Sequence, residues 1–103
     1  MKAKLGIAPI AWSNDDLPQL GGETTLETCL TESEASGFLG VETGGKFPTT
    51  PEALGPILKK HKLKLASGWF SGTVLDSDLE AEKDRALGQL TLFKELGAAC
   101  MAY

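Results

Sequence analysis

Short apolar runs alternate along the chain with longer stretches in which apolar residues recur every three or four positions. The short runs predict β-strands, and the longer stretches predict helices with one buried face. The strand candidates span residues 4–10, 38–43, 64–69 and 98–103. Because no Asn-Gly hairpin turn joins any two of them, we expect parallel strands that helices connect through right-handed crossovers.

Capping signals predict where the helices begin and end. Thr24 with Glu27, and Ser77 with Glu80, have the spacing of a capping box, so the first and third helices are expected to start there. Glycine in the left-handed conformation commonly ends a helix. The two glycines at suitable positions are Gly37 and Gly97.

The middle helix has a clear start and a disturbed interior. Thr50 followed by Pro51 is typical of an N-cap with proline at the first helical position. Pro56 lacks the amide hydrogen that an uninterrupted helix would use. We therefore expect one short turn and then a helix that restarts near Gly55.

The repeat of one strand and one helix takes roughly 30 residues, the size of one unit of an eight-unit barrel of about 250 residues. The 103 residues of the chain hold three such units and one further strand. We therefore expect an α/β fold, a partial (β/α)8 TIM barrel with parallel strands. Residues 1–103 are expected to be the N-terminal portion of a single, incomplete TIM-barrel domain.

Composition is that of an ordinary globular chain, with 42% hydrophobic and 23% charged residues. The net charge of −4 and the scattered basic residues disfavour nucleic acid as a partner. The first apolar run contains Pro9 and lacks a cleavage site, so it does not predict a signal peptide, and we expect a cytoplasmic protein without membrane contact. Cys29 and Cys100 have no Cys-x-x-Cys spacing and are expected to be buried thiols.

Polar and aromatic side chains follow the predicted strands, where the loops of such a barrel converge on one mouth. Glu42 ends an otherwise apolar strand, so it faces either a ligand or an ion-pair partner such as Lys46. Lys46 itself either orients an anionic intermediate or is a solvated loop residue. Asn14 and Asp15 either hydrogen-bond a polyol or cap their own loop.

Two tryptophans end strands on the same side. Trp12 and Trp69 either stack on a sugar-like ring or seal the top of the barrel. Together these considerations give six candidate substrate-binding residues and no assignable catalytic residue. The six are Trp12, Asn14, Asp15, Glu42, Lys46 and Trp69.

Other polar features favour structural roles. His61, the one histidine, is expected to hydrogen-bond the last carbonyls of its helix. No cluster has a recognisable metal-ligand spacing, and no glycine-rich nucleotide-binding motif is present. A run of alternating acidic residues at the start of the third helix is expected to be a solvated first turn that complements the helix dipole. It comprises Asp76, Asp78, Glu80, Glu82 and Asp84.

Three stretches together resemble the N-terminal part of inosose dehydratase, an enzyme of the xylose-isomerase-like TIM barrel group. They are residues 6–16 (Gly-Ile-Ala-Pro-Ile-Ala-Trp-Ser-Asn-Asp-Asp), 37–48 (Gly-Phe-Leu-Gly-Val-Glu-Thr-Gly-Gly-Lys-Phe-Pro) and 65–72 (Leu-Ala-Ser-Gly-Trp-Phe-Ser-Gly). The resemblance covers nearly the whole chain, and the Trp-Ser-Asn-Asp-Asp segment is its most specific part.

The resemblance implies a lyase of myo-inositol catabolism, a hydro-lyase that removes water from 2-keto-myo-inositol (scyllo-inosose) to give a trihydroxycyclohexanedione. It also implies a divalent metal, manganese or cobalt, held by ligands expected beyond residue 103. The chain alone is therefore expected to be inactive. Its partners would be a polyol ketone and either the remaining half of the barrel or further copies in a homo-oligomer.

Two other functions stay open at this point. One is a fragment of a sugar isomerase or epimerase of the same group. The other is a freestanding small α/β module that binds a ligand or another protein. Such a module should protect its outer strands, whereas the first and fourth runs are apolar on both faces and would expose unpaired edges, so an incomplete enzyme is favoured.

Overall fold

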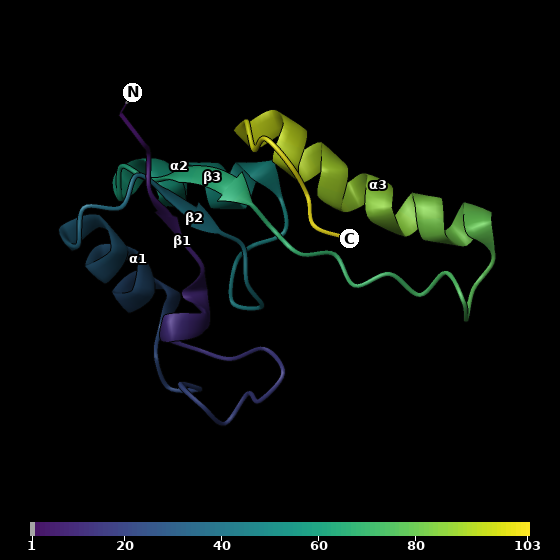
Figure 1. The fold of residues 1–103 in the computed structure, drawn as a ribbon, viewed down its shortest axis with the longest axis horizontal. Coiled ribbons are helices and arrows are strands. Elements are labelled where there is room, and N and C mark those ends of the chain that lie inside the picture. Colours follow the sequence, from purple (N-terminus) through teal and green to yellow (C-terminus); the bar gives the residue numbers. More distant parts are fainter. Residues whose placement is uncertain (1) are drawn as a thin grey trace.

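A parallel three-stranded sheet lies at the centre of the structure (Figure 1). The computed structural model describes residues 2–103. Gly40 in the middle strand is in register with Gly6 on one side and with Lys64 on the other. The predicted α/β class and the parallel pairing are confirmed. In spatial order the strands are β1 (Gly6–Ile7), β2 (Gly40–Glu42) and β3 (Lys64–Ser67).

Within residues 2–103, three α-helices alternate with the strands. The helices α2 and α3 contact each other and β3, and α3 extends well beyond the sheet (Figure 1). No helix in residues 2–103 is both long and apolar enough to cross a membrane. The helices are α1 (Leu26–Ala35), α2 (Pro51–Lys60) and α3 (Leu79–Leu96), and a short 3-10 helix η1 (Pro9–Ala11) follows β1.

The core lies between the sheet and the helices. Val41 and Leu65 are paired in register on neighbouring strands, so their side chains point to the same face of the sheet. They are 1% and 3% exposed. The opposite face of the sheet carries small residues, since a Cβ on Gly6 would lie 3.7 Å from the Cβ of Ala66. The buried core cluster consists of Leu30, Val41, Phe47, Leu54, Leu58, Leu63, Leu65, Leu92 and Phe93.

The outer predicted strands are shorter than expected. The first was predicted over residues 4–10, but Pro9 starts η1, and the amides of Trp12 and Ser13 both donate to the Pro9 carbonyl. The fourth was predicted over residues 98–103. It is represented by one isolated parallel bridge between Trp69 and Ala102.

Two helices begin one residue later than their capping boxes predicted. Thr25, not Thr24, accepts a hydrogen bond from the amide of Thr28 at 3.1 Å. Asp78, not Ser77, accepts one from the amide of Ala81 at 2.9 Å. A capping side chain needs an extended backbone and an amide two or three residues ahead, and both observed caps meet these requirements.

The middle helix is continuous, so the predicted break at Pro56 is wrong. Thr50 caps the helix and Pro51 is its first residue, as predicted. Proline clashes with the Cβ of the preceding residue in a helix. Here that residue is Gly55, which has no Cβ, so α2 continues past Pro56 to Lys60.

The C-terminal caps and one cysteine follow the prediction. Gly37 and Gly97 have φ values of 89° and 77°, in the left-handed region that favours glycine. Cys29 is buried, and burial raises the pKa of its thiol. Cys100 is exposed, contrary to expectation, because the segment around it does not enter the sheet as a full strand.

Candidate functional site

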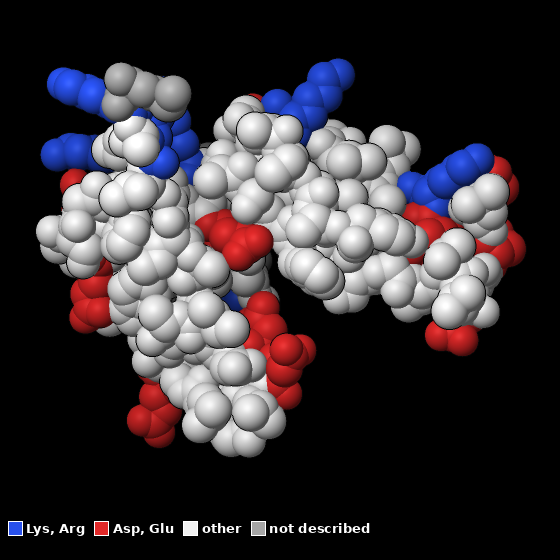
Figure 2. Space-filling model, viewed as in Figure 1, with Lys and Arg blue, Asp and Glu red and all other residues white. Residues whose placement is uncertain are grey.

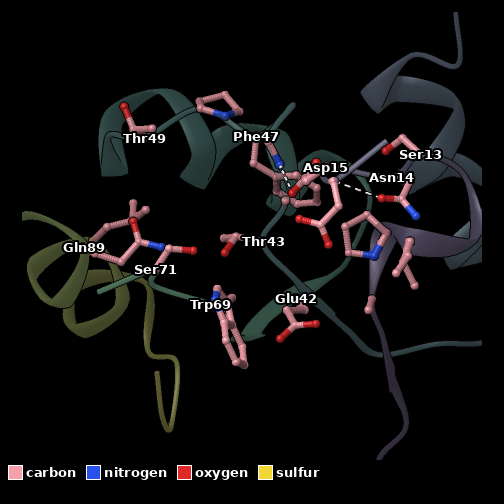
Figure 3. Close-up of a pocket in the computed structure, with 18 residues that line it drawn as sticks. Ser13, Asn14, Asp15, Glu42, Thr43, Phe47, Thr49, Trp69, Ser71 and Gln89 are labelled. Atoms are coloured by element: carbon pink, nitrogen blue, oxygen red, sulfur yellow. Dashed lines mark hydrogen bonds between the residues drawn. The ribbon is translucent and has the colours of Figure 1, made fainter. Parts of the chain in front are cut away.

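A cavity of about 690 Å³ lies where the three strands end. The loops after β1, β2 and β3 form its walls together with α3 (Figure 3). Figure 2 shows the corresponding hollow, with acidic side chains on its walls. Prominent lining residues are Asn14, Asp15, Glu42, Trp69, Ser71 and Gln89.

The loop after β1 is folded by its own polar side chains. The side-chain oxygen of Asn14 accepts hydrogen bonds from the amides of Asp16 and Leu17 at 2.9 and 3.0 Å. The carboxylate of Asp15 accepts one from the amide of Gly45 at 2.9 Å, thirty residues further along the chain. Both residues therefore shape the loop and also line the cavity.

Glu42 ends β2 and is directed into the cavity by the sheet. The register between β2 and β3 shifts after Val41, so that Glu42 is opposite Ser67 rather than Ala66. Such irregularities commonly redirect a side chain beside a functional site. Glu42 is half-buried and lines the cavity near Thr43 and Trp69 (Figure 3).

The alternative ion pair between Glu42 and Lys46 is not formed. The ammonium of Lys46 instead donates to the carbonyls of Gly21 at 2.9 Å and Gly22 at 3.1 Å, and also to that of Thr24. Lys46 therefore contacts the loop behind the cavity and is absent from the cavity lining.

The two tryptophans are placed differently. Trp69 borders the cavity and is 64% exposed, and an aromatic ring in such a place can stack on a ligand. The indole of Trp12 donates to the carboxylate of Glu32 in α1 and lies outside the cavity. The structure thus brings together Asn14, Asp15, Glu42 and Trp69, and places Trp12 and Lys46 elsewhere.

Sequence reasoning missed the contribution of α3 to the cavity. Gln89 lines the cavity beside Leu92, three residues further along the helix. Residues three apart share a helix face. A polar residue next to an apolar position at that spacing is the signal that could have pointed to Gln89.

A second polar cluster surrounds Glu82, which was expected to be solvated but has a side chain that is only 5% exposed. Its carboxylate accepts hydrogen bonds from the Tyr103 hydroxyl at 2.8 Å and the Thr73 amide at 2.9 Å, and it pairs with Arg85 at 2.7 Å. These donors, Tyr103 first, lower the pKa of Glu82. The same bond raises the pKa of Tyr103.

An aromatic pair supports this cluster. The rings of Phe70 and Tyr103 stack with centroids 5.8 Å apart, and the guanidinium of Arg85 lies 5.4 Å from the centre of the Phe70 ring. A cation over an aromatic face is attracted to the ring. The cluster fixes the loop after β3 against the start of α3.

His61 is buried outside the cavity lining, between α1 and α2. Its Nε2 lies 3.1 Å from the Glu27 carboxylate, rather than at the helix carbonyls where it was expected. Lys60 also binds Glu27. The hydrogen bond from Lys60, and to a smaller extent that from His61, lowers the pKa of the Glu27 carboxyl. His61 therefore joins two helices.

A divalent metal would need more ligands than this segment brings together. Across residues 2–103, no group of three or more histidine, cysteine, aspartate or glutamate side chains is close enough to hold an ion. Catalytic zinc sites, for comparison, use three protein ligands. The residues described here do not by themselves fit a manganese or cobalt site.

Comparison with known proteins confirms the expected resemblance. No family model matches the chain. It is 46% identical over 103 residues to the rhizopine catabolism protein MocC of Rhizobium meliloti, covering 100% of this chain and 32% of that protein. It is 41% identical over 97 residues to inosose dehydratase of Geobacillus thermodenitrificans, covering 94% of this chain and 33% of that protein.

A third relative has the same name as the second. The chain is 50% identical over 70 residues to inosose dehydratase of Clostridium tetani, covering 68% of this chain and 24% of that protein. The chain thus spans about a third or less of the length of these curated relatives.

Proposed function

We propose that this chain is part of an inosose dehydratase and forms an arc of a (β/α)8 barrel whose mouth binds 2-keto-myo-inositol. The observation that carries the proposal is the 41% identity over 94% of the chain to a protein of that name. The parallel sheet and the cavity at the ends of its strands support it, because barrel enzymes bind their substrates there.

The cavity offers groups that suit a cyclic polyol. Asp15 and Glu42 present carboxylate oxygens that accept hydrogen bonds from hydroxyl groups, and such charge-assisted bonds are strong. The exposed ring of Trp69 provides an apolar face for the carbon skeleton. Ser71 and Gln89 add neutral donors and acceptors from the opposite wall.

Dehydration beside a ketone requires removal of a proton from carbon and departure of a hydroxyl group. A carboxylate positioned in a cavity can accept such a proton or assist the leaving group. Glu42 and Asp15 are the two carboxylates that we propose hold the substrate, and neither is assigned as the base. Residues 2–103 do not assemble the ligands of the manganese or cobalt ion that the resemblance implies, so the role proposed for these two carboxylates is to bind the substrate.

A chimera tests the proposal. The chain would replace the matching residues of the inosose dehydratase of Geobacillus thermodenitrificans, to which it is 41% identical. We expect the purified chimera to dehydrate 2-keto-myo-inositol with added manganese or cobalt, within about a hundredfold of the parent kcat/KM. The 103 residues alone serve as the control and should give no turnover. A folded but inactive chimera would contradict the proposal.

A role in rhizopine catabolism is the second candidate. The specific observation that favours it is the 46% identity over the whole chain to a protein with that description. The corresponding chimera with MocC, assayed with rhizopine and with 2-keto-myo-inositol, separates the two candidates. Turnover of rhizopine alone would favour the second.

We also propose a cytoplasmic location. Both cysteines in the chain are free thiols, and Cys100 is exposed. Exposed free thiols are usual in reducing compartments and are rare among secreted proteins. Fractionation of cells that express the protein from its own gene would test this location.

A further inference from the structure

Lys46 occupies a cradle of backbone carbonyls. Its Nζ donates to the carbonyl oxygens of Gly21 at 2.9 Å and Gly22 at 3.1 Å, and it contacts that of Thr24 as well. An ammonium group has three N–H donors and no acceptor. Three carbonyls therefore use its full hydrogen-bonding capacity, although the residue as a whole is exposed.

The shape of this cradle is built into the loop after β1. Gly21 has a φ of 71°, and a Cβ at that position would lie 1.9 Å from the carbonyl oxygen of Trp12. The loop therefore doubles back closely on itself, and the amide of Asn14 donates to the carbonyl of Leu20 at 3.2 Å. Carbonyls that converge in this way suit a cation with several N–H donors, and the Gly21 carbonyl also accepts a hydrogen bond from the amide of Thr24 at 3.0 Å.

Gly45, the neighbour of Lys46, makes a second attachment between the loop after β2 and the loop after β1. The amide of Gly45 donates to the Asp15 carboxylate at 2.9 Å, while Lys46 holds the far end of the loop that carries Asp15. Adjacent residues after β2 thus fix both ends of the loop after β1. Figure 3 shows Asp15 at the cavity wall, with its carboxylate directed toward the loop after β2.

We propose that Lys46 is a positioning residue, whose ammonium fills the carbonyl cradle of Gly21, Gly22 and Thr24 and thereby holds Asp15 at the cavity. It does not contact the ligand. Its charge is used within the loop, and the described residues that line the cavity include carboxylates but no lysine or arginine. The inference depends on the loop geometry, and only the nature of the ligand rests on the proposed function.

Nuclear magnetic resonance of the 103-residue chain tests this role. The probe is the Gly45 amide, whose chemical shift and hydrogen exchange report its bond to Asp15. In Lys46→Met we expect hydrogen exchange at Gly45 to rise by about tenfold or more. The amide of Leu54, which is completely buried in the core, should keep its protection. Lys64→Met, at an exposed position in β3, is the matched control and should leave both amides unchanged.

Chemical rescue separates positioning from a general loss of structure. Lys46→Ala removes the atoms of a propylammonium ion, so added propylammonium should restore the Gly45 signal. Tetramethylammonium has the same charge but no N–H donor, and should not restore it. Lys46→Arg keeps a cation with several donors and should retain most of the wild-type exchange protection.

Several outcomes would overturn the proposal. Unchanged Gly45 exchange in Lys46→Met, or equal rescue of Lys46→Ala by propylammonium and tetramethylammonium, would show that the cradle does not position Asp15. Loss of all native amide signals in Lys46→Met would show that the whole fold, and not one loop, depends on the lysine. None of these readouts involves dehydration, so their failure is distinguishable from failure of the proposed function.

Discussion

The hydroxyl of Tyr103 donates a 2.8 Å hydrogen bond to the carboxylate of Glu82, which joins the last residue of the chain to the start of α3. The same carboxylate binds the amide of Thr73 and the guanidinium of Arg85. Because the Glu82 side chain is only 5% exposed, these partners replace the water that it would otherwise bind. The cluster therefore connects three segments through one carboxylate.

Tyr103→Phe should raise the pKa of Glu82 toward its ordinary value of 4.5, since the tyrosine hydroxyl is the main cause of the lowered pKa. A lowered folded-state pKa contributes stability that is present above pH 4.5 and is lost as the pH falls through the folded-state pKa. The variant should thus be less stable at neutral pH and lose less stability on acidification. Carbon-detected titration of Glu82 and denaturation at several pH values measure both effects.

Glu52→Gln is the control for this titration, because Glu52 lies in α2 and is exposed. This substitution should leave the titration midpoint of the Glu82 carboxyl unchanged. An unchanged Glu82 midpoint in Tyr103→Phe would show that the hydrogen bond does not set this pKa.

Gly21→Ala should destabilise the chain by at least about 1 kcal/mol, because alanine is strained at positive φ and its Cβ would meet the Trp12 carbonyl. Gly88→Ala provides the opposite control. Gly88 lies within α3, and a Cβ added there would have no neighbouring atom within 4 Å, so alanine should stabilise the chain by about 0.5–1 kcal/mol. Urea denaturation measures the change in the free energy of unfolding for both variants. The same change for Gly21→Ala and Gly88→Ala would contradict the loop geometry at Gly21.

Leu54→Ala should lower the free energy of unfolding by about 2–5 kcal/mol, because Leu54 is 0% exposed and its truncation leaves a cavity in the core. Leu75→Ala is the matched control, since Leu75 is 97% exposed, and its effect should stay within about 0.5 kcal/mol. A small effect of Leu54→Ala in thermal or urea denaturation would show that the core does not depend on α2.

Glu42→Gln, made in the chimera described above, should raise KM by about tenfold or more, because a charge-assisted hydrogen bond to a substrate hydroxyl is weakened. Asp76→Asn also removes one negative charge, but Asp76 is exposed and lies outside the cavity lining. Steady-state kinetics should show it unchanged. Equal kinetics for the two variants would remove Glu42 from the proposed site.

Local signals predicted much of the fold. Thr50 with Pro51, and the glycines Gly37 and Gly97, act within one or two turns of their own helix, so the chain around them suffices to identify them. The parallel order of the strands followed from their spacing and from the absence of hairpin turns. The helix starts predicted from the capping boxes at Thr24 and Ser77 were wrong by one residue. Several neighbouring side chains can cap a helix, and packing selects among them.

Long-range contacts explain what the sequence did not reveal. The burial of Glu82 depends on Tyr103, which is 21 residues away, so an acidic run alone could not distinguish it from its solvated neighbours. The cradle around Lys46 likewise depends on carbonyls 22 to 25 residues earlier. By contrast, the sequence could predict that Asn14, Asp15, Glu42 and Trp69 lie around one cavity, because parallel strands bring their carboxyl ends to one edge.

Within residues 2–103, β1 pairs with β2 alone, and Leu5 beside it is 63% exposed. A strand with one free edge and an apolar neighbour can recruit a strand from another copy, so we expect concentrated solutions of this chain to self-associate, which light scattering would measure. Lys2 and Lys4, both exposed just before the strand, oppose such pairing by charge repulsion. Added salt screens that repulsion, so self-association of the chain should increase as the ionic strength rises.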